Sequence, residues 1–228
     1  MKKIFSKFIG FILSPFVKII RYGALKLMKK FYRPGDRRPA MAAADHMLDE
    51  IILLSVFRTF QEDKFRELAN FKKLPISEHD RIFNELEVAG MCMAVFYLET
   101  AKNFVRDGEF HFWRDVEEEL PRQLQKKLVG FGVSSSDGKL MKQLIDMRYK
   151  EYNELAEQIL RADTTISSEF KNKPPEIKRL MGMAQAIAVG TADHIRRGKL
   201  EEKDSLIKHL VLWLIKLQKR IDRFLKRL

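Results

Sequence analysis

The chain has little of what catalysis and covalent cross-linking require. Its single cysteine, Cys92, excludes an internal disulfide and any zinc site built from several cysteines. The patterns of a serine nucleophile (Gly-x-Ser-x-Gly), a phosphate loop (Gly-x-x-x-x-Gly-Lys-Ser/Thr) and a dinucleotide fold (Gly-x-Gly-x-x-Gly) are absent. So is Glu-x-x-His, which a di-iron helical bundle uses twice. We therefore expect no cofactor and no metal, and no motif identifies a catalytic residue.

Strand signals are missing as well, because no alternating apolar pattern lies between hairpin turns. Apolar residues instead recur every three to four positions between helix start and stop signals. The sequence predicts an all-α protein with a single helical-bundle domain of about five to six helices at residues 40–228. The helices are expected at 40–71, 77–108, 109–128 with an interruption near Pro121, 139–162, 175–198 and 202–228. The apolar centre of the second, Val88–Leu98, is typical of a central helix.

No acidic residue occurs before Asp36, and nine Lys or Arg residues lie in the first 33 positions, here called the arm. Up to Arg38 there are 11 basic residues and one acid, so this segment holds +10 of the net charge of +12. Residues 39–215 carry 26 basic and 29 acidic residues. A nucleic-acid-binding protein usually places basic residues on its folded surface, so nucleic acid is not the expected partner.

A long apolar run is also lacking. The longest charge-free stretch of the arm, Phe8–Val17, has 10 residues and contains Gly10 and Pro15, whereas a spanning helix needs roughly 18. No small-x-small cleavage signal follows it closely. We interpret the arm as an interfacial anchor for an anionic membrane surface. A cleaved targeting peptide, a spanning helix and docking onto a protein or nucleic acid are the alternatives.

The spacing of the arm favours this interpretation, because its basic residues share one helical face and Phe and Ile share the other. We expect two helices, at 3–13 and 15–32, joined to the body by a hinge at 34–39 that uncouples the two. The predicted membrane-binding residues are Lys2, Lys3, Phe5, Lys7, Phe8, Ile9, Ile12, Phe16, Lys18, Ile20, Arg21, Lys26, Lys29 and Lys30.

The last helix has an unbroken heptad-like spacing of apolar residues. This spacing is typical of a bundle's closing helix, but it also suits a partner-binding surface. The C-terminal seam, which is the candidate partner-binding set, consists of Leu210, Trp213, Leu214, Leu217, Ile221 and Phe224. From Lys216 onward there are six basic residues and one acid, which adds a possible second basic contact.

One cluster resembles a metal-binding pair in spacing: Asp45 and Asp49 share a helical face, as do His46 and Glu50. Acids in the first turns of a helix also offset its dipole, and that is the simpler explanation. Together these features predict a membrane-peripheral adaptor, scaffold or assembly factor on the cytoplasmic face of a membrane. Its body would bind a protein partner or a second copy of the chain. The alternative is a membrane-associated enzyme or lipid handler with a site inside the bundle.

Overall fold

The computed structural model describes residues 15–101, 109–162, 174–200 and 204–228, and every regular element among them is helical. Within these ranges no helix has both the length and the apolar character needed to cross a membrane. The elements are α2 (Pro15–Lys30), α3 (Arg38–Met47), the π-helical η1 (Leu48–Leu53), α4 (Leu54–Gln61), α5 (Asp63–Leu68), the 3₁₀ turn η2 (Phe71–Lys73), α6 (Ile76–Ala101), α7 (Phe110–Gly130), α8 (Ser135–Ala162), α10 (Pro175–Arg196) and α11 (Ser205–Arg227).

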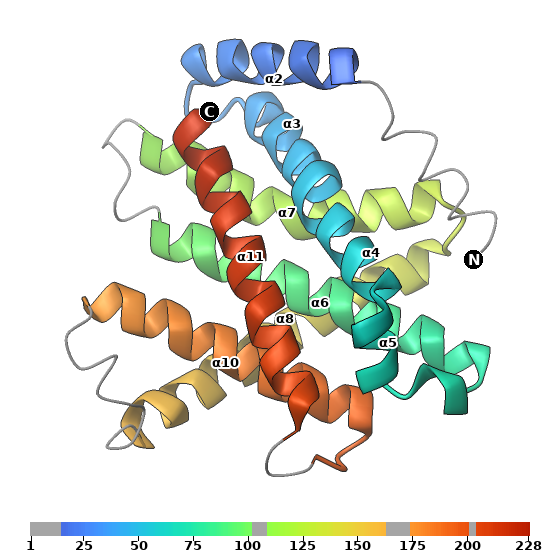
Figure 1. The fold of residues 1–228 in the computed structure, drawn as a ribbon. Coiled ribbons are helices and arrows are strands. Elements are labelled where there is room, and N and C mark those ends of the chain that lie inside the picture. Colours follow the sequence, from blue (N-terminus) through green and yellow to red (C-terminus); the bar gives the residue numbers. More distant parts are fainter. Residues whose placement is uncertain (1–14, 102–108, 163–173, 201–203) are drawn as a thin grey trace.

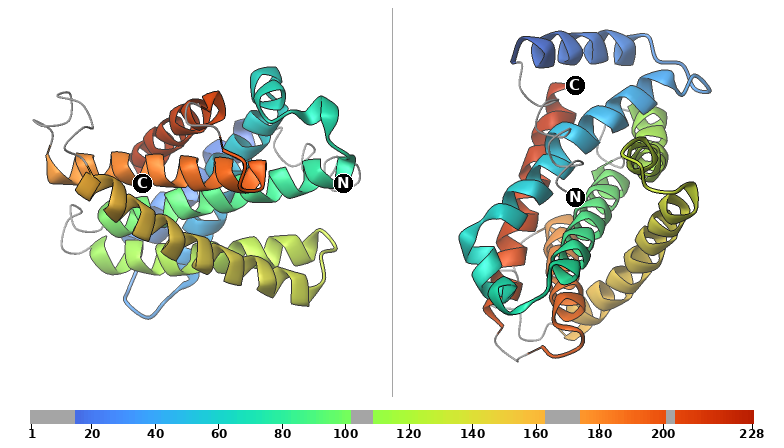
Figure 2. Two further views of the ribbon diagram at one scale, coloured as in Figure 1. Left: turned by 90° about the horizontal axis from the view of Figure 1, so that it is seen from below. Right: turned by 90° about the vertical axis from the view of Figure 1, so that its right-hand side faces the viewer.

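Helix α6 lies at the centre of the bundle, with α4, α7, α8, α10 and α11 packed around it (Figures 1 and 2). Nearly every residue from Glu85 to Leu98 is buried, which confirms the predicted central helix. Gly90 allows η1 and α4 to approach closely, because a Cβ there would lie 3.3 Å from Ile52 of η1 and 3.2 Å from Val56 of α4. Cys92 is buried in the same helix.

Helices α3, η1 and α4 form one continuous rod along the outside of the bundle, and α11 runs on the same side of α6 (Figure 1). The rod packs through α3 on α7 and through α4 on α6. α11 packs on α10 and α6, and α10 also packs on α8. The small residues of α10 permit this contact, since a Cβ on Gly190 would collide with the ring of Tyr152.

Helix α2 lies across one end of the bundle, over the start of α3 and near the C-terminal end of α11 (Figures 1 and 2). The ring centres of Tyr22 on α2 and Phe224 on α11 are 6.3 Å apart, so α2 contacts the C-terminal part of α11. The predicted helix at 3–13 lies outside the described residues.

The all-helical class is confirmed, but several predicted boundaries are wrong. The expected helix 40–71 ends at Gln61 because Glu62 adopts an extended conformation, with φ −63° and ψ 125°. α7 continues through Pro121 without the expected interruption. α8 begins at Ser135, four residues earlier than expected, where the Ser134 hydroxyl accepts a hydrogen bond from the Asp137 amide.

Candidate membrane-docking face

The apolar side of α2 points away from the bundle. Ile20, Leu27 and Phe31 expose 58%, 59% and 68% of their surface, and Met28 is also exposed. Their spacing places them on one helical face, here called the docking face. A helix of a soluble bundle normally turns such a face inward, so the exposed face of α2 is a candidate docking surface.

The opposite side of α2 is anchored to the bundle. Leu25 is 4% exposed within the core. Arg21 donates a 2.5 Å hydrogen bond to Asp45 and lies 3.5 Å from Asp49. Lys127 of α7 approaches the same carboxylates, at 2.8 Å from Asp49 and 3.0 Å from Asp45. The cluster flagged as a metal-binding pair is therefore an ion-pair network that attaches α2.

Lys29 anchors the other end of α2. Its ammonium lies 3.0 Å from the carboxylate of Glu109 and 5.0 Å from the centre of the Trp113 ring. Lys26 is exposed over the Tyr22 ring at 5.4 Å, and Lys30 is exposed. The cations of α2 whose side chains are described, from Arg21 to Lys30, therefore divide into an inward pair, Arg21 and Lys29, and an outward pair, Lys26 and Lys30, beside the docking face.

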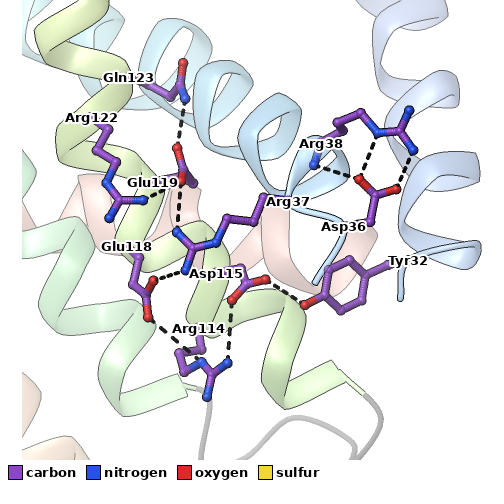
Figure 3. A network of polar contacts seen from close by, with 10 residues as sticks. All are labelled: Tyr32, Asp36, Arg37, Arg38, Arg114, Asp115, Glu118, Glu119, Arg122 and Gln123. Carbon is purple, nitrogen blue, oxygen red and sulfur yellow. Dashed lines mark hydrogen bonds and ion pairs between the residues drawn. The ribbon is translucent and has the colours of Figure 1, made fainter. Parts of the chain in front are cut away.

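The segment after α2 is also held to the bundle, as Figure 3 shows. Tyr32 donates a 2.8 Å hydrogen bond to Asp115, and Arg37 donates to Glu118 at 2.7 Å and to Glu119 at 3.2 Å. Burial and the Asp115 carboxylate raise the pKa of Tyr32 to about 12. The expectation of a hinge that leaves the arm independent does not fit these contacts, because residues far apart in sequence clamp the segment to α7.

The structure describes the side chains of only five of the predicted membrane-binding residues. Ile20, Lys26 and Lys30 are exposed. Arg21 and Lys29 face the bundle, because they pair with carboxylates on α3, on η1 and just before α7. Outside the described side chains lie Lys2, Lys3, Phe5, Lys7, Phe8, Ile9, Ile12, Phe16 and Lys18. Leu27 and Phe31, which the helical spacing of the sequence places on the same apolar face as Ile20, are exposed too, as is Met28.

The C-terminal seam is buried throughout, with Leu210, Leu214, Leu217 and Ile221 fully enclosed. Trp213 donates a 3.0 Å hydrogen bond from its ring nitrogen to the Ser55 hydroxyl, and His46 stacks on Phe224. The prediction of a partner-binding seam is therefore not met: these side chains form the chain's own core. A partner cannot reach them unless α11 moves.

The bundle interior offers no clear reaction centre in the described residues. No group of three or more His, Cys, Asp or Glu side chains there is arranged to hold a metal ion. A cavity of about 460 Å³ lies between α6, α10 and α11, but Tyr97 and Lys226 already bind its Asp222. Burial raises the pKa of Glu87 on α6 to about 8. One buried carboxyl with a raised pKa does not by itself define an activity.

Comparison with known proteins found no matching family model, no matching curated protein and no matching solved structure. The geometry of α2 and of the body is therefore the basis of the functional proposal.

Proposed function

We propose that this chain is a peripheral membrane protein that lies on an anionic bilayer through α2 and holds its helical body at the surface as an adaptor or scaffold. The observation that carries the proposal is the orientation of α2. Its inward cations bind carboxylates of the body, while its docking face and Lys26 and Lys30 point outward. An apolar strip flanked by lysines matches the boundary between acyl chains and anionic headgroups.

The free energies expected from apolar burial and from charge attraction are large enough for reversible binding to a membrane. Fully burying one large apolar side chain contributes about 1.5–3 kcal/mol, and each cation near an anionic surface contributes about 1 kcal/mol. Ile20, Leu27 and Phe31 are 58%, 59% and 68% exposed, so burying the exposed part of all three would contribute about 3–5 kcal/mol. With about 2 kcal/mol from the two outward lysines, the total is in the range of a micromolar to millimolar complex. The basic residues of the arm before α2 would add to this attraction.

The adaptor role is supported by a second apolar surface at the junction of α7 and α8. Leu140 and Met147, spaced by two helical turns, are 59% and 55% exposed. With Leu128 and Leu144 they line a groove of about 580 Å³. A groove of this kind suits a protein partner, and because it lies on other helices, α2 can remain on the membrane while the groove is occupied.

Vesicle sedimentation of the full chain tests the membrane role. We expect the triple variant Ile20→Ser/Leu27→Ser/Phe31→Ser to bind vesicles of phosphatidylcholine and phosphatidylserine about tenfold or more weakly, since it removes the apolar contribution. It should keep the melting temperature, because these side chains already face water. The matched control Leu140→Ser/Met147→Ser removes equally exposed apolar groups and should bind like the wild type. Equal loss in both variants, or in neither, would contradict docking through α2.

A further inference from the structure

The cavity of about 460 Å³ in the bundle lies where five segments of the chain meet. Its walls come from the ends of α2, α6 and α11, from the first turns of α10 and from the residue before α7, which all lie on the left-hand side of Figure 1. Ligand sites in proteins have volumes of about 300–1,000 Å³, so the cavity is large enough for a small organic molecule.

Apolar side chains form part of the cavity wall. Ala101 of α6, Leu180 of α10 and Leu225 of α11 line it, and all three pack against the bundle core. Covering such a surface with an apolar group of a ligand is favourable, because it removes the surface from water. The cavity therefore suits an amphiphile better than a fully polar compound.

Four of the six charged side chains in the described lining are already paired with one another. The ammonium of Lys29 lies 3.0 Å from the carboxylate of Glu109. Lys226 lies 2.8 Å from Asp222, which also accepts a 2.6 Å hydrogen bond from Tyr97. These groups satisfy each other without a ligand, so they close the wall of the cavity rather than select what enters it.

The other two charged side chains of the lining are Glu176, in the first turn of α10, and Arg227, the last residue of α11. Both are exposed, and in the part of the chain that the structure describes neither has an oppositely charged partner. A carboxylate accepts hydrogen bonds from an ammonium group, and a guanidinium donates paired hydrogen bonds to a phosphate. The cavity thus combines an apolar wall with one free anion and one free cation.

We propose that this cavity binds an ethanolamine phospholipid through its headgroup and the first part of an acyl chain, with Arg227 on the phosphate and Glu176 on the ammonium. A choline headgroup is less suitable, because its quaternary ammonium has no N–H to donate and is typically bound by a cage of aromatic faces. Tyr97 is the single aromatic residue among the described residues of the lining.

The neighbourhood of α2 favours a membrane as the source of the ligand. Lys29, on the inward side of the helix that carries the docking face, lines the cavity. A lipid that leaves the membrane at the docking face would therefore meet the cavity on the other side of the same helix. This step rests on the proposed membrane role, whereas the lining and its free charges do not depend on it.

Isothermal titration calorimetry of the full chain with monomeric lysophosphatidylethanolamine and lysophosphatidylcholine tests the headgroup assignment. We expect the wild type to bind the ethanolamine lipid about tenfold more tightly, because the choline group cannot donate a hydrogen bond to Glu176. The variant Glu176→Gln/Arg227→Gln should lose this preference. The control Lys139→Gln/Glu154→Gln removes one exposed base and one exposed acid from α8 and should keep it. Equal affinity of the wild type for the two lipids would overturn the assignment.

The variant Ala101→Phe fills the cavity and tests the location of the site. We expect it to bind both lysolipids about tenfold or more weakly, since the ring occupies the space of the acyl chain. Unchanged binding by a folded Ala101→Phe protein would overturn the cavity as the site. If this variant does not fold, the double Gln variant still decides, because its two positions are exposed.

Glycerophosphoethanolamine, which has the same headgroup without a chain, separates a lipid from a soluble zwitterion. We expect it to bind far more weakly than the lysolipid, and equal affinity would overturn the assignment to a lipid. The docking-face variant Ile20→Ser/Leu27→Ser/Phe31→Ser should bind the monomeric lysolipid like the wild type. Loss of lysolipid binding in that variant would refute the cavity site, whereas unchanged vesicle binding in it would refute only the proposed docking through α2.

Discussion

At the scale of single residues, the buried acids set the dependence of stability on pH. Glu87 lies in the apolar centre of α6, and burial raises its pKa from the usual 4.5 to about 8. Between these values the folded chain keeps a proton that the unfolded chain has released. This contribution to stability is complete below pH 4.5 and is lost as the pH rises to about 8.

Glu87→Gln should therefore stabilise the protein at neutral and alkaline pH, because the amide resembles the protonated acid and does not ionise. We expect a gain of about 3 kcal/mol at pH 7 and almost none at pH 4. Urea denaturation of the wild type and the variant at the two pH values measures this difference in the free energy of unfolding. Glu85→Gln is the control and should lower the stability, because it removes the negative charge of a carboxylate that lies 3.7 Å from Arg148. An equal gain at both pH values would show that folding does not raise the pKa of Glu87.

At the scale of helices, the 3.6-residue pattern predicted where α6, α10 and α11 lie but not which side of α2 faces the body. Sequence spacing divides α2 into a basic and an apolar face. It does not reveal that Asp45 and Asp49 of the rod and Glu109 before α7 would attract Arg21 and Lys29. Such pairing across distant segments is a tertiary property.

Charge reversal on the two sides of α2 should have separate effects. Arg21→Glu/Lys29→Glu places acids against Asp45, Asp49 and Glu109, so α2 should detach and the melting temperature should fall, at a cost of about 1–3 kcal/mol. Lys30→Glu/Arg33→Glu changes two exposed cations by the same amount and should leave the melting temperature unchanged while weakening binding to anionic vesicles. Calorimetry together with vesicle sedimentation compares the variants. If neither variant changed stability, α2 would not be anchored by these pairs.

At the scale of the whole molecule, the sequence predicted the helical class but not how α2 is connected to the bundle. The segment after Lys30 contains Pro34 and Gly35, and Gly35 has a φ of +97°, so a helix break there was predictable. The clamp of Tyr32 and Arg37 onto α7 was not, because its acids lie about 80 residues further along the chain. The arm's last helix and the bundle are thus joined by a short segment that is fixed at both ends.

The integrity of the whole bundle depends on the C-terminal seam, and two leucines of α11 test this directly. Leu214 is completely buried between α11 and the bundle, whereas Leu212, two positions earlier, is 59% exposed. Leu214→Asp would bury an unpaired carboxylate, at a cost of several kcal/mol against a total stability of about 5–15 kcal/mol, so we expect the chain to unfold. Leu212→Asp introduces the same group on the same helix, where water solvates it, and should leave helicity and mass unchanged. Circular dichroism and analytical ultracentrifugation measure both variants. A folded Leu214→Asp protein that has only lost a bound partner or second copy would mean that α11 leaves the core in solution and that the seam binds another chain after all.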